Sequence, residues 1–174
     1  MLLSFTIWLQ NTDLFAYVRN SGYAYPVLLS LHILCISLFG GMILATDMRI
    51  LGWGMRNHSI SDIVNQLRVP KRVGFVLVAT CGILLIVSKA EEYYYNPFVR
   101  IKMVLLALVA VHAVVFRSSV YNKAAALDQL KPLPVRAKLA AGLSLLLWLS
   151  IACAGRAIGY ISGSAGSHHY AGLL

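Results

Sequence analysis

Four long apolar stretches dominate the chain and restrict what it can fold into. They run over residues 26–46, 73–88, 98–116 and 139–155, and charged residues or proline bound each of them. A helix needs about 20 predominantly apolar residues to cross a bilayer, with a lower limit near 17. The pattern predicts four transmembrane helices over residues 24–48, 70–90, 97–118 and 135–159.

The composition supports this interpretation. Of the 174 residues, 59% are hydrophobic and 12% are charged, whereas soluble domains are about half apolar and about a quarter charged. Four spans leave little chain for anything else, so we expect one domain over residues 23–161 and no soluble catalytic module. The predicted fold class is an all-α, integral membrane four-helix bundle.

The segments that flank this domain differ from it. Residues 1–22 mix apolar and polar side chains, which is typical of an N-terminal interfacial amphipathic segment with Trp8 and Tyr17 at headgroup level. Such a segment serves as an anchor or as a lid over the bundle. Residues 162–174 are small and polar, and we expect a flexible tail in which His168 and His169 are mobile.

The net charge of +9 reflects topology rather than nucleic-acid binding. Ten of the 15 lysines and arginines lie in two loops, between the first and second spans and between the third and fourth. The positive-inside rule makes these loops cytoplasmic and both termini external, as in a multi-pass protein of the bacterial inner membrane. The loops also attract anionic lipid. Asp47 is expected at the cytoplasmic boundary, neutralised by Arg49.

Ionisable side chains at membrane depth are candidate functional residues because they are costly to bury. The set is His32, Lys102, His112 and Arg156, with Arg100 near a helix end. Interhelical hydrogen bonds are one explanation for the histidines. Two histidines in one small bundle favour ligation of a cofactor or metal by His32 and His112. Gly40 and Gly41 would admit a ring or a neighbouring helix.

Haem fits these residues better than zinc or a di-iron centre, because the chain has no cysteine cluster and no inward-facing set of carboxylates. Imidazole is a standard axial ligand of haem iron. Arg100, Lys102 and Arg156 could pair with the propionates. The three cysteines fall inside predicted spans, and we infer no disulfide.

Helix rise separates the candidates by depth. At 1.5 Å per residue, His32 lies roughly 10 Å below Tyr25, and Lys102 roughly 8 Å below Pro97. His112 and Met42 lie deeper, at roughly 22 Å and 26 Å on the same estimate. The arithmetic indicates an outer site around His32 and Lys102, and separately an inner site around His112 and Met42.

Three segments also carry a family resemblance, which covers most of residues 23–161: LHILCISLFGGMILATDMRILG, NPFVRIKMVLLALVAVHAVVF and AGRAIGYI. They resemble a family of bacterial four-helix membrane proteins of about this length. More distantly, the chain resembles the copper-resistance D-type membrane proteins and the haem-containing membrane protoporphyrinogen oxidases. The resemblance to the oxidases implies haem b at His32 and Lys102, with His112 matching a histidine further along the third helix. Leu38 and Phe39 stand where those oxidases often have a tryptophan.

These observations predict a b-type haem protein, with one or two haems, that transfers electrons between a quinone or an external donor and a partner protein. It would be a membrane oxidoreductase or an electron-transfer subunit, and no catalytic residue is assigned. A homodimer would add shelter for the macrocycle. One alternative is a copper-handling protein or transporter, with imidazoles and thioethers as soft ligands along a path through the membrane: His32, Met42, Met48 and His112. Another is a structural subunit of a membrane complex.

Overall fold

Every element of the computed structural model is helical across the residues that it describes, which are 2–117, 120–130 and 132–170. Side chains are described for residues 4–116, 120–130 and 132–160. The elements are α1 (Leu2–Gln10), α2 (Asp13–Asn20), α3 (Ala24–Leu51), α4 (Ile60–Gln66), α5 (Arg68–Ser88), α6 (Ala90–Tyr95), α7 (Pro97–Arg117), η1 (Tyr121–Lys123), α8 (Ala124–Asp128) and α9 (Val135–Tyr170).

Four of these helices, α3, α5, α7 and α9, are long and apolar enough to cross a membrane, which confirms the predicted fold class. Their outward faces expose large apolar side chains, such as Leu38, Val114 and Leu149. Exposed apolar area on this scale suits hydrocarbon rather than water. The helices begin and end within three residues of the predicted bounds, except at the C-terminal end of α9. That helix continues to Tyr170, through most of the segment expected to be a flexible tail.

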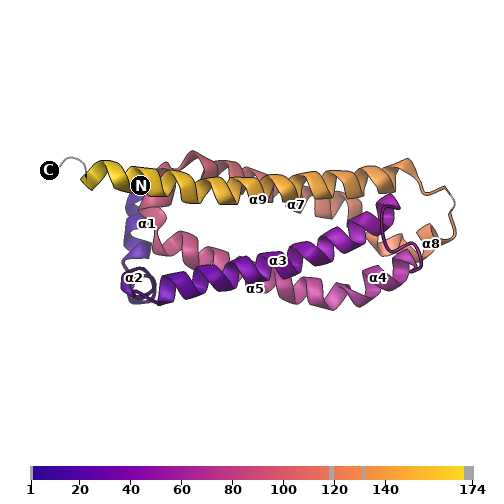
Figure 1. The fold of residues 1–174 in the computed structure, drawn as a ribbon, viewed down its shortest axis with the longest axis horizontal. Coiled ribbons are helices and arrows are strands. Elements are labelled where there is room, and N and C mark those ends of the chain that lie inside the picture. Colours follow the sequence, from indigo (N-terminus) through magenta and orange to yellow (C-terminus); the bar gives the residue numbers. More distant parts are fainter. Residues whose placement is uncertain (1, 118–119, 131, 171–174) are drawn as a thin grey trace.

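The long helices form two antiparallel hairpins (Figure 1). In one hairpin α3 packs along α5, in the other α7 packs along α9, and contacts between α3 and α9 join the two. Both chain termini lie at the same end of the bundle, here called the termini end. The connections with α4 and α8 lie at the opposite end, here called the basic end, which carries the two basic loops.

At the termini end, α1 and α2 run across the bundle rather than along it (Figure 1). Gln10 joins α1 to α6 through two hydrogen bonds: its Nε2 donates to Oε2 of Glu91 at 3.3 Å, and its Oε1 accepts from the Glu91 backbone N–H at 3.1 Å. Trp8 and Tyr17 are exposed, as the predicted interfacial placement requires. α1 and α2 therefore cover the end of the bundle nearest His32.

At the basic end, a small apolar core holds the connecting helices against the bundle. It contains Ile50, Ile60, Val64, Val120, Ala124, Leu127, Ala137, Ala140 and Ala141. The alanines of α9 allow the helix backbones to approach closely. Asp128 links α8 to α4: its Oδ1 accepts from the Ile60 N–H at 2.6 Å and its Oδ2 from the Ser61 N–H at 3.0 Å.

We expect Asp128→Ala to destabilise the basic end by about 1–3 kcal/mol, because two N–H groups at the start of α4 lose a charged acceptor. Asp128→Asn keeps one acceptor oxygen and should lose less. Thermal unfolding of the detergent-solubilised protein gives both values. Equal stability of all three proteins would show that the link from α8 to α4 contributes nothing.

The same contact predicts a pH dependence. Burial disfavours the Asp128 carboxylate, but hydrogen bonds from Ser61 and Ile60 outweigh this and hold its pKa below the usual range. A depressed pKa in the folded state means that the stabilisation is present above the unfolded value of about 3.9. It is lost as the pH falls through the folded-state value, and the Asp128→Ala protein should lack this part of the acid destabilisation.

Candidate functional site

Two groups of polar side chains lie inside the bundle, at different depths. The histidine cluster comprises His32 and Lys102 with the neighbouring Gly82 and Gly155. The aspartate cluster comprises Thr46, Asp47, Lys71, Tyr121 and Ser144. The first lies toward the termini end and the second toward the basic end, because their α3 residues are about 20 Å apart along the helix.

His32 is buried, and α5 holds its ring closely. A Cβ placed on Gly82 would lie 3.1 Å from Cε1 and 3.7 Å from Nε2 of the ring. Only a residue without a side chain therefore leaves the ring its present position. The Val78 carbonyl interacts with His32, but Nδ1 is buried without a hydrogen-bond partner. An unpaired buried nitrogen is costly and calls for an explanation such as a missing ligand.

Lys102 faces the same level of the bundle from α7. A Cβ placed on Gly155 of α9 would lie 3.5 Å from its Nζ. The ammonium is also close enough to interact electrostatically with His32. Among the described side chains, no hydrogen bond or ion pair engages this lysine. All four long helices therefore contribute to the histidine cluster, two with functional groups and two with glycines.

His112 lies elsewhere and has a partner. Its Nε2 is 2.9 Å from the Ala140 carbonyl of α9, and its ring packs on Phe116. With Nε2 protonated, this is an interhelical hydrogen bond. The structure does not bring His112 to His32 or to Met42, whose methyl group packs against Gly74.

The two arginines lie on the exposed surface. Arg100 donates to the Tyr94 carbonyl at 3.2 Å. The guanidinium of Arg156 lies 5.2 Å from the ring centroid of Tyr160. Each is within two residues of a member of the histidine cluster along its helix, so both charges lie near the cluster but outside the bundle interior.

The glycines at close contacts are not the ones that the sequence singled out. A Cβ on Gly40 or Gly41 would meet no atom within 4 Å. Gly74, Gly82 and Gly155 instead provide the close approaches, to Phe39 and Met42, to His32 and to Lys102 respectively. The sequence marks Gly40 and Gly41 because they are adjacent. Isolated glycines in apolar helices give no such signal.

Asp47 is not paired with Arg49, contrary to the expectation from the sequence. Arg49 Nε donates to the His58 carbonyl at 2.6 Å, while Asp47 is 1% exposed. Residues two apart on a helix point in different directions. The neighbours of Asp47 come from other elements: Tyr121 donates to its Oδ1 at 3.4 Å, and Ser144 and Lys71 also interact with it.

Aromatic contacts lie between the two clusters along α3, although the Phe75 ring is 58% exposed. The Phe39 ring lies 5.3 Å from Trp148 and 6.1 Å from Phe75, measured between centroids. His32, Phe39 and Thr46 follow one another at seven-residue intervals, so they occupy one face of α3. Phe39 therefore lies between the histidine cluster and the aspartate cluster on this face.

No group of three or more histidine, cysteine, aspartate or glutamate side chains is placed to hold a metal ion in the part of the chain that the structure describes. Cys35 and Cys81 are buried next to each other, and Cys153 is exposed. The copper alternative requires that Met42, Met48, His32 and His112 lie along one path. The described residues do not bring these side chains together as a cluster of metal ligands.

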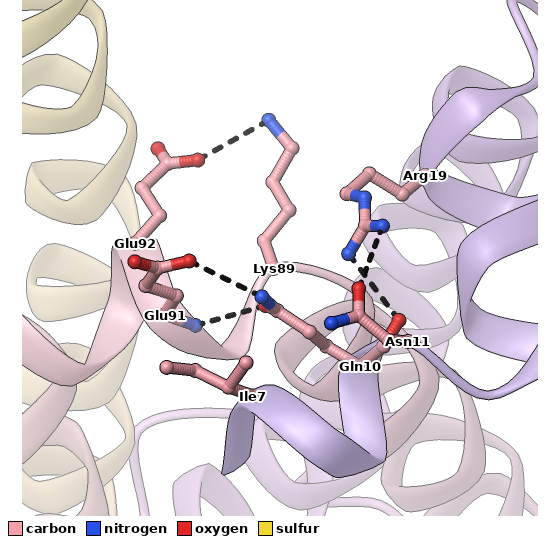
Figure 2. A pocket seen from close by; sticks show the side chains of 7 residues that line it. All are labelled: Ile7, Gln10, Asn11, Arg19, Lys89, Glu91 and Glu92. Carbon is pink, nitrogen blue, oxygen red and sulfur yellow. Dashed lines mark hydrogen bonds and ion pairs between the residues drawn. The ribbon is translucent and has the colours of Figure 1, made fainter. Parts of the chain in front are cut away.

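A polar surface pocket of about 380 Å³ lies at the termini end, where α1 and α2 meet the start of α6 (Figure 2). Its lining comprises Ile7, Gln10, Asn11, Arg19, Lys89, Glu91 and Glu92. Arg19 donates to the Gln10 carbonyl and to Asn11 Oδ1, each at 3.2 Å, and Lys89 pairs with Glu92 at 3.5 Å (Figure 2). These contacts hold α1, α2 and α6 together. The pocket therefore lies among the short helices that cover the termini end of the bundle.

Comparison with known proteins places the chain in one family. The model of DUF6644, a family of unknown function, matches residues 5–161, and the chain belongs to this family. The match begins within α1 and covers α3, α5, α7 and the part of α9 up to residue 161, which includes every member of the histidine cluster. No curated protein and no solved structure gives a significant match.

Proposed function

We propose that this DUF6644 protein is a membrane-embedded b-type haem protein in which the histidine cluster holds the haem iron. His32 would hold the haem iron, and Lys102 would bind the haem from the opposite hairpin, either at the iron or at a propionate. Bound haem would supply one-electron redox chemistry, so the protein would transfer electrons between a quinone or an external donor and a partner protein.

The observation that carries the proposal is the unpaired Nδ1 of His32. In a bilayer an unsatisfied polar group costs several kcal/mol, because no water is available to pair with it. Coordination to a metal removes that cost. The imidazole lies close against Gly82 of α5, where a Cβ would come within 3.1 Å of its Cε1, so helix packing limits how far the ring can move.

Lys102 supports the proposal from the opposite hairpin. A partly buried ammonium without a counter-ion is unfavourable, whereas a neutral amine is a donor to iron. Gly155 leaves room for its Nζ. The resemblance to the haem-containing membrane protoporphyrinogen oxidases implies the same two residues. Arg100 and Arg156 lie within two residues of the cluster along α7 and α9, where they could pair with propionates.

The surrounding residues limit what reaches the site. Phe39 packs edge-on against Trp148 on the side of the cluster that faces the basic end. α1 and α2 cover the termini end. By the positive-inside rule we place the basic end in the cytoplasm and both termini outside. The histidine cluster then lies in the outer half of the membrane, near an external electron donor.

The test is an absorption spectrum of the detergent-purified protein, first air-oxidised and then reduced with dithionite, with a pyridine haemochrome assay for haem content. We expect a Soret band that shifts on reduction, with resolved α and β bands. Absence of visible bands in protein expressed with ample haem would overturn the proposal.

Two substitutions of Lys102 test the second ligand. Lys102→Leu removes both the amine and the charge without adding a donor to iron, and Lys102→Arg keeps the charge but does not ligate iron. If the amine is a ligand, both variants should lose the six-coordinate, low-spin spectrum. If the residue only pairs with a propionate, Lys102→Arg should retain the spectrum of the unmodified protein.

A further inference from the structure

The aspartate cluster has no role in the proposed haem site, yet it contains the most deeply buried carboxyl group among the described residues. Asp47 is 1% exposed, and its Oδ2 is buried without a hydrogen-bond partner. Its Oδ1 accepts a long bond, at 3.4 Å, from the Tyr121 hydroxyl, and the Ser144 side chain also interacts with the carboxyl group. The carboxyl group therefore has one acceptor position that the protein leaves open.

The nearest cation does not close that position. Lys71 interacts with Asp47 electrostatically, but its Nζ donates to Oγ1 of Thr46. Within the described residues, the ion pair recorded at 4 Å or less joins Lys89 to Glu92, and none involves Asp47. The aspartate and the lysine are therefore neighbours in the membrane without forming a closed salt bridge.

The other elements around Asp47 add few charges. Tyr121 comes from η1, and Ser144 of α9 is near enough to interact with the carboxyl group. One helical turn before Ser144, the Ala140 carbonyl is bonded to His112 of α7. The residues that α4 packs against α3 are apolar, among them Ile60. The titratable side chains that face Asp47 are therefore Lys71 and Tyr121. His112 does not face it directly, but is bonded to the α9 backbone one turn before Ser144.

We propose that Asp47 is an intramembrane proton-exchange site that is open to the basic end of the protein. A proton from water binds at the free Oδ2, where an O–H bond forms and the carboxylate becomes a neutral carboxylic acid. Release reverses this step and returns the proton to water. Lys71, Tyr121 and Ser144 stabilise the ionised form, and the apolar surroundings tolerate the neutral one.

The position of Asp47 along α3 indicates the end of the bundle with which it exchanges protons. Asp47 is four residues from Leu51, the last residue of α3, or about 6 Å of helix. On its other side, the buried Phe39 packs against Trp148 between Asp47 and the histidine cluster, and neither ring is a proton carrier. Protons are therefore exchanged with the basic end and not with the histidine cluster. The inference is independent of haem binding.

The experiment is infrared difference spectroscopy during a pH titration of the full-length protein in detergent. The chain has only six aspartate and glutamate residues, so the carbonyl stretch of a buried, protonated carboxylic acid should be resolved. We expect such a band to titrate in the unmodified protein and to be absent from Asp47→Asn. It should remain in Asp128→Asn, which makes the same change in a less buried carboxyl group at the same end.

A second variant keeps the test decisive if Asp47→Asn does not fold. Tyr121→Phe removes the hydroxyl that donates to Oδ1, so it should shift the frequency of the band without abolishing it. The proposal is overturned if no carboxylic acid band titrates in the unmodified protein. It is also overturned if the band is unchanged in a folded Asp47→Asn or in Tyr121→Phe.

Discussion

Replacement of His32 by alanine is expected to remove haem from the purified protein while leaving the bundle folded. Under the proposed function the imidazole binds the haem iron, its buried Nδ1 has no hydrogen-bond partner, and alanine offers no donor to iron. We expect at least a tenfold fall in bound haem, equivalent to about 1.4 kcal/mol or more of binding free energy. The haem-to-protein ratio from the pyridine haemochrome assay measures this fall.

His112→Ala is the matched control, because both histidines are 8% exposed and both lie inside the bundle. It deletes the hydrogen bond to the Ala140 carbonyl, so it should lower stability by about 0.6–1.7 kcal/mol. The visible spectrum should not change. Loss of haem from His112→Ala, with His32→Ala unaffected, would move the haem site to the inner half of the bundle. Loss from both would indicate a site that depends on the whole bundle.

Gly82→Leu should have an effect nearly as large, although it changes no candidate ligand. The Cβ alone would come within 3.1 Å of Cε1 of His32, and the rest of the leucine side chain would displace the ring from its position. Overpacking of this kind costs about 1–3 kcal/mol. We expect a folded, less stable protein that has lost most of its haem, as measured by absorption and by thermal unfolding.

Gly41→Leu makes the same chemical change where there is space. Gly41 is exposed, and a Cβ there would meet no atom within 4 Å. This variant should keep both its haem and its stability. If Gly41→Leu and Gly82→Leu behaved alike, the contact between α5 and the imidazole would not matter for the site.

The spans could be predicted from the sequence because their signal is local. A run of apolar residues with charged flanks is itself the property that makes a helix cross a membrane. Helix rise along one axis also gives depth, which is why Lys102 was expected at the level of His32. The end of α9 could not be predicted in this way, because composition does not show whether a polar tail continues as a helix.

A local sequence pattern does not show which side of a helix faces its neighbours when the helix is apolar on all sides. Asp47 was assigned to Arg49 by proximity in sequence, but burial directs the aspartate inward and the arginine toward His58. The neighbours of Asp47, such as Lys71 and Tyr121, come from segments 24 and 74 residues further along the chain. For the same reason, no local pattern in the sequence indicates that Gly82 faces His32.

The division into two hairpins has a consequence for biogenesis. His32 and Gly82 belong to the first hairpin, which can insert and pack while the ribosome is still translating the second. Lys102 and Gly155 belong to the second hairpin, which is synthesised later. The second hairpin packs against the first through the contact between α3 and α9. If the histidine cluster holds haem as proposed, the haem is captured only after synthesis of α9, and its capture marks a completed molecule. Chains truncated before α9 would stay in the membrane as colourless precursors.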